Sequence, residues 1–365
     1  MSQRSCLLCR NDMLRKILMS SIALIGCFCL MGATSVWNLG YYLDCVKGQV
    51  DILWKRQPIE KVIARPDTPE SLKEKLKTVL SIRDFASSEL HLPDNRSYRL
   101  YADIGRRYAV WNVVATPEFS VDPLKWCFPI AGCVSYRGFH KPEKAQVFAD
   151  SLRAEGYDVY LYGVSAYSTL NWFSDPVLNT FIKRPAPYLA ALIFHELAHQ
   201  VVYVKDDSAF NEAFAKTVEL EGVRRWLATQ HNSAEIEKFS HSFQREEAFS
   251  HLVIDFREKL RKLYAQPLTD EAKLRAKEKQ FSEFRQDYLM LKESWNGYSG
   301  FDRWMAKDLN NAKLVSISTY HDLVPAFRAL LKHEQGDLSK FYSAVAELKE
   351  LSPAARREAL ARFQQ

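Results

Sequence analysis

The sequence lacks the features that would place it in a specialised class of protein. Its 365 residues contain no internal repeat and no low-complexity linker, and 47% hydrophobic with 26% charged residues is ordinary globular composition rather than that of a disordered chain. An excess of one charge is also missing. The net charge is +6, and residues 1–26 contribute +3 of it through four basic residues against one acid. The remaining +3 is too little for a nucleic-acid surface, so we predict no nucleic-acid partner.

Cysteine is scarce in the part of the chain that we expect to fold. Four of the seven cysteines lie in or beside an N-terminal leader: Cys6, Cys9, Cys27 and Cys29. Within the body, Cys127 and Cys133 bracket the short segment FPIAG, which an oxidising compartment could close with a disulfide. The alternative is a pair of buried free thiols.

The leader predicts export of the chain. Arg15 and Lys16 precede an apolar run that ends in Leu-Ile-Gly-Cys27, the form of a lipobox, in which the cysteine after the cleavage site carries lipid. The alternative is an uncleaved helical anchor over Ile17–Leu39, which is long enough to span a bilayer, and a plain secretory signal is a third reading. Each reading places the body on the periplasmic side of the inner membrane. We therefore expect residues 1–45 to be the signal or anchor and residues 46–365 to be the domain.

The body has the pattern of an α+β fold that is mainly helical. Strands are expected at residues 107–115, 133–139 and 157–164, with a helix before the third strand, which predicts a small mixed sheet. A charged stretch over residues 233–294 predicts a helical hairpin whose second helix starts at Thr269 or Asp270. A solvated hairpin and a partner-binding arm both fit this stretch. A short β-like run is expected before Tyr320.

The segment ALIFHELAHQ (191–200) contains the candidate metal ligands and the candidate general base. His195 and His199 are four residues apart, so on a helix both side chains reach one ion. Glu196 is the next residue along the helix after His195, so its carboxylate lies beside the metal rather than on it. This position suits a general base that acts on a metal-bound water. The alternative to a metal site is an ordinary helix that has two polar residues at a groove.

A catalytic zinc takes three protein ligands and leaves one position for water, so a third ligand is needed. Glu212 lies in a second helical stretch, AFNEAFAKTVELEG, with a plausible turn between the two helices. Two packed helices would then present His195, His199 and Glu212 to one zinc ion per chain. Glu219 and Glu221 compete with Glu212 for the role of third ligand.

HELAHQ followed by NEAFA resembles the aminopeptidase N family of gluzincins, in which the glutamate of the second motif is the third zinc ligand. The resemblance implies that Glu212 is that ligand, although the spacing between the two motifs is shorter here. A wider resemblance covers most of the chain, through segments such as YYLDCVKGQ, LPDNRSY, VWNVVATPEFS and WCFPIAGCVSYRGF. It is to a zinc-dependent aminopeptidase family of Gram-negative bacteria, often predicted lipoproteins, and it implies a zincin-like metallopeptidase domain. Cys27 lies further upstream of YY than the lipobox cysteine of that family does.

Peptide hydrolysis also needs a donor for the tetrahedral oxyanion. Tyr320 and His321 are the candidates, because downstream Tyr or His residues serve this role in gluzincins, and Tyr167 is a third. The segment LYGVSAYS could supply an edge strand that pairs with an extended peptide. For the substrate's N-terminal ammonium, Glu118 and Asp175 are candidate carboxylates, and spacing selects neither.

The sequence therefore predicts a membrane-anchored, periplasm-facing zinc metallopeptidase that acts on peptide or protein substrates as an aminopeptidase. An envelope zinc endopeptidase is the alternative within enzymes. A non-catalytic, zinc-stabilised envelope lipoprotein that binds partners is the alternative from another class. Glu196 argues against the last, because a structural zinc site has no use for a general base.

Overall fold

The computed structural model describes residues 36–128, 132–166, 169, 173–231, 233–317 and 323–364. The chain divides into two units, Met1–Asp51 and Ile52–Gln365, and all elements treated below belong to the second except most of helix α2 (Val36–Lys55). None of the helices in these ranges combines the length and the apolar character that crossing a membrane requires. The predicted lipobox, and most of the predicted anchor, lie outside the described residues.

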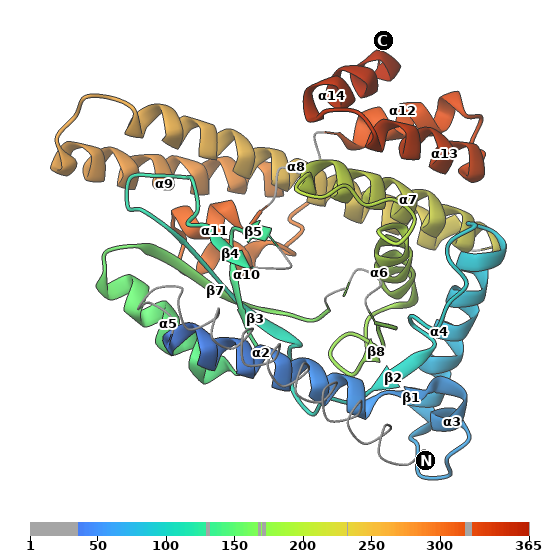
Figure 1. Ribbon diagram of the computed structural model, residues 1–365. Coiled ribbons are helices and arrows are strands. Elements are labelled where there is room, and N and C mark those ends of the chain that lie inside the picture. The colour runs from blue at the N-terminus through green and yellow to red at the C-terminus, as the bar shows by residue number, and fades with distance from the viewer. Residues whose placement is uncertain are drawn as a thin grey trace, which may run out of the picture. The chain divides into compact units, whose positions relative to one another are not determined.

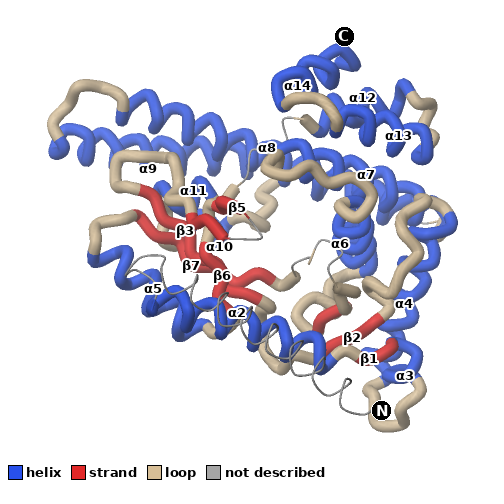
Figure 2. Tube along the Cα trace, in the orientation of Figure 1, coloured by secondary structure: helices blue, strands red, loops and turns tan. Residues whose placement is uncertain are grey.

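The mainly helical α+β class is confirmed (Figure 2). The principal sheet is antiparallel, with β3 (Val110–Thr116) between β6 (Arg137–Phe139) and β7 (Asp158–Val164). Because side chains alternate along a strand, one face of β3 presents Val113 to helix α5 (Pro142–Ala154), which covers that face. Strand β7 lies at an edge of this sheet, as the substrate-pairing hypothesis requires.

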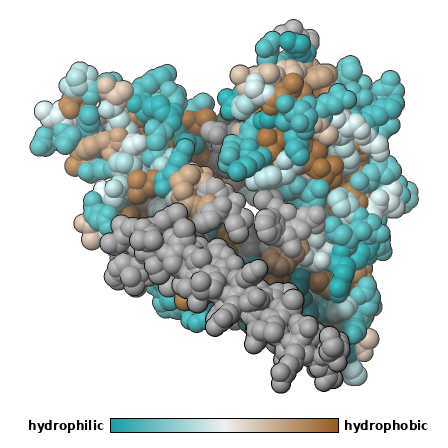
Figure 3. All heavy atoms as spheres, viewed as in Figure 1, coloured by the Kyte–Doolittle hydropathy of each residue, from teal (hydrophilic) through white to brown (hydrophobic). Residues whose placement is uncertain are grey.

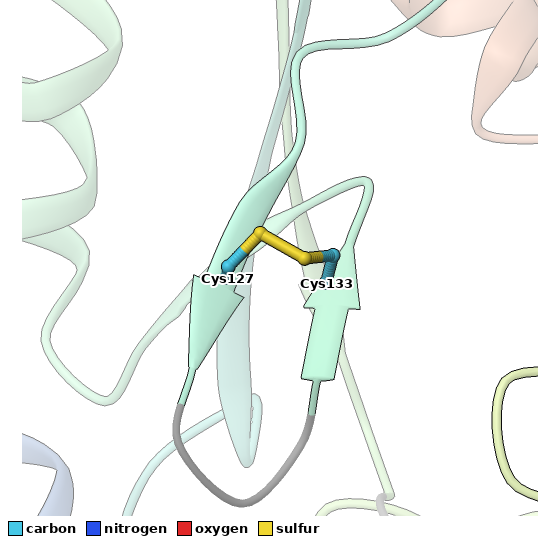
Figure 4. The surroundings of a disulfide bond; sticks show 2 residues. All are labelled: Cys127 and Cys133. Atoms are coloured by element: carbon cyan, nitrogen blue, oxygen red, sulfur yellow. A yellow bond between two sulfur atoms is a disulfide. The ribbon is translucent and has the colours of Figure 1, made fainter.

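The predicted strand over residues 133–139 is two strands, so that prediction is wrong in part. Strand β5 (Gly132–Val134) pairs with β4 (Trp126–Phe128) in a separate hairpin, whereas β6 pairs with β3. Cys127 and Cys133 lie directly opposite each other in the hairpin and form the predicted disulfide (Figure 4). The bond holds β5 against β4, and a bend at residue 135 lets the chain change sheets.

The main apolar core lies where α4 (Glu70–Ser88), α6 (Ala186–Ala198) and α7 (Ser208–Thr229) pack together (Figure 1). Gly222 of α7 allows the close approach of α6, because a Cβ there would lie 2.7 Å from the ring of Phe194. The contact is one residue from His195, so the same glycine sets the spacing of the two helices at the site. A second small sheet precedes α6 in the chain. Its strands are β1 (Gln57–Pro58), β2 (Leu100–Ala102) and β8 (Val177–Leu178), and the short helix α3 (Ile59–Ile63) directly follows β1.

The predicted helical hairpin is present as α8 (Ser233–Tyr264) and α9 (Asp270–Ser294), and Thr269 caps α9 by accepting the amide of Ala272. Hydrophilic and hydrophobic residues are interspersed over its visible surface (Figure 3). Buried residues of α8 and α9 form an apolar cluster that is separate from the main core. Met305 of α10 (Asp302–Ala306) belongs to the same cluster.

The C-terminal part is helical. Helix α11 (Asn311–Val315) packs on β7, β3 and α8, and its Leu314 belongs to the apolar cluster of the hairpin. Helix α12 (Val324–His333) packs on α7, and α13 (Leu338–Lys349), α14 (Pro353–Ala361) and a 3₁₀ turn at Arg362–Gln364 follow it. Phe327 of α12 contacts Phe210 of α7, with ring centroids 5.0 Å apart. Helix α11 lies where a β-like run was expected. The side chain of Asn310 accepts the amide of Lys313, and this cap starts a helix that the apolar run did not indicate.

Candidate metal centre

Helix α6 brings the two motif histidines together. Pro185 precedes the first turn and Pro187 lies within it, where the missing amide hydrogens cost nothing. The helix then continues through apolar residues that are buried on most sides, which fixes its orientation in the core. His195 and His199 follow on one face with ring centroids 4.8 Å apart.

Glu212, in the second turn of α7, reaches both histidines. The ligand atoms of the three side chains all lie within 4.8 Å of one another. Glu212 Oε2 is 3.2 Å from His195 Nε2, and Glu212 Oε1 is 3.6 Å from His199 Nε2. Ligands on one tetrahedral zinc at bond lengths near 2.0–2.1 Å are roughly 3.3 Å apart. The three residues therefore fit a zinc ion.

The burial of the three side chains leaves the site open on one side. The side chain of His199 is 6% exposed and that of His195 19%, whereas that of Glu212 is 33% exposed. Two imidazoles and one carboxylate make three ligands, and the exposed side of Glu212 leaves access for a fourth. Among the described residues, His199 Nδ1 is buried without a hydrogen-bond partner.

Glu219 contacts the other nitrogen of His195. Its Oε2 lies 3.1 Å from Nδ1, and Lys216 donates to its Oε1 at 2.8 Å. A hydrogen bond from Nδ1 leaves Nε2 for a metal and fixes the ring, as in many zinc sites. Glu221, the other competitor for the ligand role, instead binds Arg224 and Arg225. Of the three glutamates, Glu212 is the one placed between the two histidines.

The two histidines differ in charge. Burial opposes the charged form of His195, but hydrogen bonds with Glu212 and Glu219 outweigh burial and raise its pKa to about 10. Burial and the neighbouring charge of His195 lower the pKa of His199 to about 4. Burial alone would raise the pKa of Glu212, but His195 and His199 lower it. Without a metal, His195 is therefore the protonated, positively charged histidine, and His199 is neutral. A divalent cation would compete with that proton.

Comparison with known proteins adds an independent observation. Residues 40–360, which include both helices of the site, match a family described as "Putative aminopeptidase". The chain belongs to this family. No curated protein and no solved structure gives a significant match. Family membership assigns the chain to the peptidases, and the polar cluster on α6 and α7 is the candidate active site of this aminopeptidase family member.

Glu196, the predicted base, follows His195 on α6. Its charge acts on Tyr98, which is 2% exposed: burial, and then Glu196 and Asp175, raise the pKa of Tyr98 well above its usual range. Sequence reasoning missed Tyr98, because it lies about 100 residues before the motif. The sequence did indicate Glu219, but as a competitor for the role of third ligand. It lies seven residues after Glu212 and therefore on the same helical face.

The remaining predicted residues have different outcomes. Tyr167, Tyr320 and His321 lie outside the described residues, so their roles stay predictions. The carboxylate of Asp175 is buried and accepts hydrogen bonds from both the amide and the hydroxyl of Thr169. Glu118 is exposed, and its backbone carbonyl accepts from Lys277 and Asn311, on the side of the hairpin. The structure therefore gives Asp175 and the backbone of Glu118 structural roles.

Proposed function

We propose that this peptidase is a zinc-dependent aminopeptidase, anchored to the membrane by its N-terminus and facing the periplasm. The observation that supports the proposal most strongly is the convergence of His195, His199 and Glu212 at separations that suit one tetrahedral metal. Family membership supports the aminopeptidase assignment. The basic and apolar leader supports export and anchoring.

Zinc bound by these three residues would supply a Lewis acid and lower the pKa of a water to near neutrality. Glu196 takes a proton from the attacking water and delivers it to the amine that leaves. Glu219 keeps His195 in the tautomer that presents Nε2, and Lys216 holds Glu219 in place. Tyr320 or His321 donates a hydrogen bond to the oxyanion.

The substrate would enter on the exposed side of Glu212. Strand β7 lies at the edge of its sheet, and an extended peptide can add to such an edge through main-chain hydrogen bonds. Main-chain pairing alone does not require a free N-terminus, so this edge also suits the endopeptidase alternative. A non-catalytic zinc-stabilised fold is disfavoured, because three protein ligands leave an accessible fourth position.

The exopeptidase assignment is tested with matched peptides that carry either a free or an acetylated N-terminus. We expect release of N-terminal residues from the free peptides alone, and a loss of about 10²–10⁴-fold in kcat in Glu196→Gln. Equal cleavage of acetylated peptides at internal bonds would replace the aminopeptidase by the endopeptidase. No hydrolysis of any peptide by the zinc-loaded wild type would contradict peptidase function altogether.

A further inference from the structure

The motif on α6 ends in Gln200, whose role the metal ligands do not explain. Gln200 follows Glu196 by four residues, and residues at this spacing lie on the same helical face. His199, at the C-terminal cap, keeps helical dihedral angles (φ −59°, ψ −21°), so the helical path continues to Gln200. The side chain of Gln200 therefore marks the direction of the α6 face that carries Glu196.

Gln200 binds a segment that lies about 100 residues earlier in the chain. Its Oε1 accepts a hydrogen bond from Asn95 Nδ2 at 2.7 Å, and its Nε2 donates to Ser97 Oγ at 3.4 Å. The segment Asn95–Tyr98 thus lies against the face of α6 that carries the proposed base.

A buried arginine holds the same segment from α4. Arg83 has no exposed surface, and it donates from Nε to the carbonyl of Ser97 at 3.0 Å and from Nη2 to that of Asn95 at 3.2 Å. Within the segment, the side chain of Asn95 accepts the amide of Ser97 at 2.9 Å. A buried charge is costly unless it is hydrogen-bonded, so the guanidinium and the loop carbonyls stabilise each other.

Tyr98 ends the segment in a conformation that side chains rarely adopt. Its φ is +61°, in the left-handed region, and its amide donates to the carbonyl of Asp175 at 2.7 Å. Such backbone strain persists only where surrounding contacts impose it, and it concentrates at functional sites. Tyr98 is 2% exposed, so the residue is held in the interior directly after the residues that Gln200 binds.

We propose that the segment Asn95–Tyr98 positions the general base. Gln200 fastens the segment to the α6 face that carries Glu196, and the fastened segment limits how the Glu196 carboxylate can turn, which keeps it directed toward the attacking water. This inference rests on the proposed function, because Glu196 is the base only in a hydrolase. Asn95 and Gln200 act through Glu196, so they are positioning residues, and neither is needed to bind the metal.

The test compares Asn95→Ala and Gln200→Met with the wild type in the full-length protein. Loss of orientation at a reacting group costs about 10–100-fold, so we expect kcat to fall by this factor while KM and zinc content stay unchanged. Gln280→Met on α9 is the matched control for Gln200→Met, and Tyr264→Phe, which removes a buried hydroxyl bonded to Asn311, controls for the loss of a hydrogen bond elsewhere. Both controls should keep the kcat of the wild type.

Hydrogen exchange supplies a readout that does not depend on activity. In Gln200→Met, the amides of Ser97 and Tyr98 should exchange faster than in the wild type, whether or not zinc is bound. Unchanged exchange would contradict the clamp, and wild-type kcat in both variants would contradict the positioning role while leaving the proposed function intact. A wild type without hydrolytic activity would instead contradict the proposed function.

Discussion

The α6–α7 pair and the α8–α9 hairpin place their polar residues in opposite ways. In the pair, polar and charged groups such as His195, His199 and Glu219 lie inside the helix–helix interface. In the hairpin, most charges lie outside, as in the ion pair of Glu258 with Arg261, and aromatic rings fill the inside. The hairpin follows the usual pattern of a stable helical structure, with its apolar residues inside and its charges exposed to water.

The difference indicates what each region is for. A buried charge needs a partner. His195 and Glu219 bind each other, and Lys216 also donates to Glu219. His199 Nδ1 still has no partner among the described residues. The hairpin contains one buried cation, Lys277, which Asp158 and a backbone carbonyl satisfy. We infer that the pair is built for chemistry and the hairpin for stability, and four substitutions test this contrast.

The largest expected effect is that of Glu196→Gln on catalysis. Removal of a general base costs about 10²–10⁴-fold in kcat, and the variant should keep its zinc because Glu196 is not a ligand. Peptide hydrolysis and metal content measured on the same sample check this. Glu278→Gln, an exposed change on α9, is the control, and near-normal activity of Glu196→Gln would rule out the assigned base.

In the hairpin, Phe256→Ala should affect stability and spare the metal site. Phe256 is 2% exposed and stacks on Phe284 with ring centroids 4.3 Å apart. Truncation of a buried phenylalanine costs about 3–5 kcal/mol, which denaturant unfolding would measure. The exposed Leu274→Ala is the control. Loss of zinc from folded Phe256→Ala protein would break the contrast between the two regions.

A smaller effect is expected from Glu219→Gln. The amide cannot replace the charge that faces His195 Nδ1, and loss of such an orienting carboxylate lowers metal affinity about 10–100-fold. Competition with a chelator measures the change. Glu221→Gln, on the same helix but paired with arginines, should leave the affinity as it is. The reverse ranking of the two variants would mean that Glu221 is the residue near the metal.

The smallest effect is that of Glu258→Gln, which removes an exposed ion pair with Arg261. Exposed pairs contribute at most about 1 kcal/mol, and salt screens them. Unfolding at low and high ionic strength should show a small difference that disappears in salt. A loss comparable to that of Phe256→Ala would show that the charges of the hairpin, rather than its rings, hold it together.

The sequence was sufficient for the parts of the site that local periodicity determines. His195 and His199 share a face because they are four residues apart, and Glu212 comes on the next helix after a short turn. The role of Glu219 needed the packing of α6 on α7, which depends on Gly222. The contact of Gln200 with Asn95 joins residues far apart in the chain, and periodicity carries no information about such a contact.

Short elements were predicted less well for a similar reason. Residues 133–139 have the composition of a single strand throughout. Strand pairing and a disulfide nevertheless assign the two ends of this segment to different sheets. A β-like run was expected before Tyr320, but residues 311–315 of that stretch form helix α11, which starts from a side-chain cap at Asn310. A few residues give a weak preference, and tertiary contacts override it.

A single metal held by His195, His199 and Glu212 is central to the proposed function. The most direct test is elemental analysis with zinc-edge absorption spectroscopy on the purified wild type and on Glu212→Ala. We expect one zinc per wild-type chain with nitrogen and oxygen ligands and no sulfur, and markedly less zinc in the variant. A wild type that binds no zinc, or a variant with full zinc content and unchanged ligands, would contradict the account.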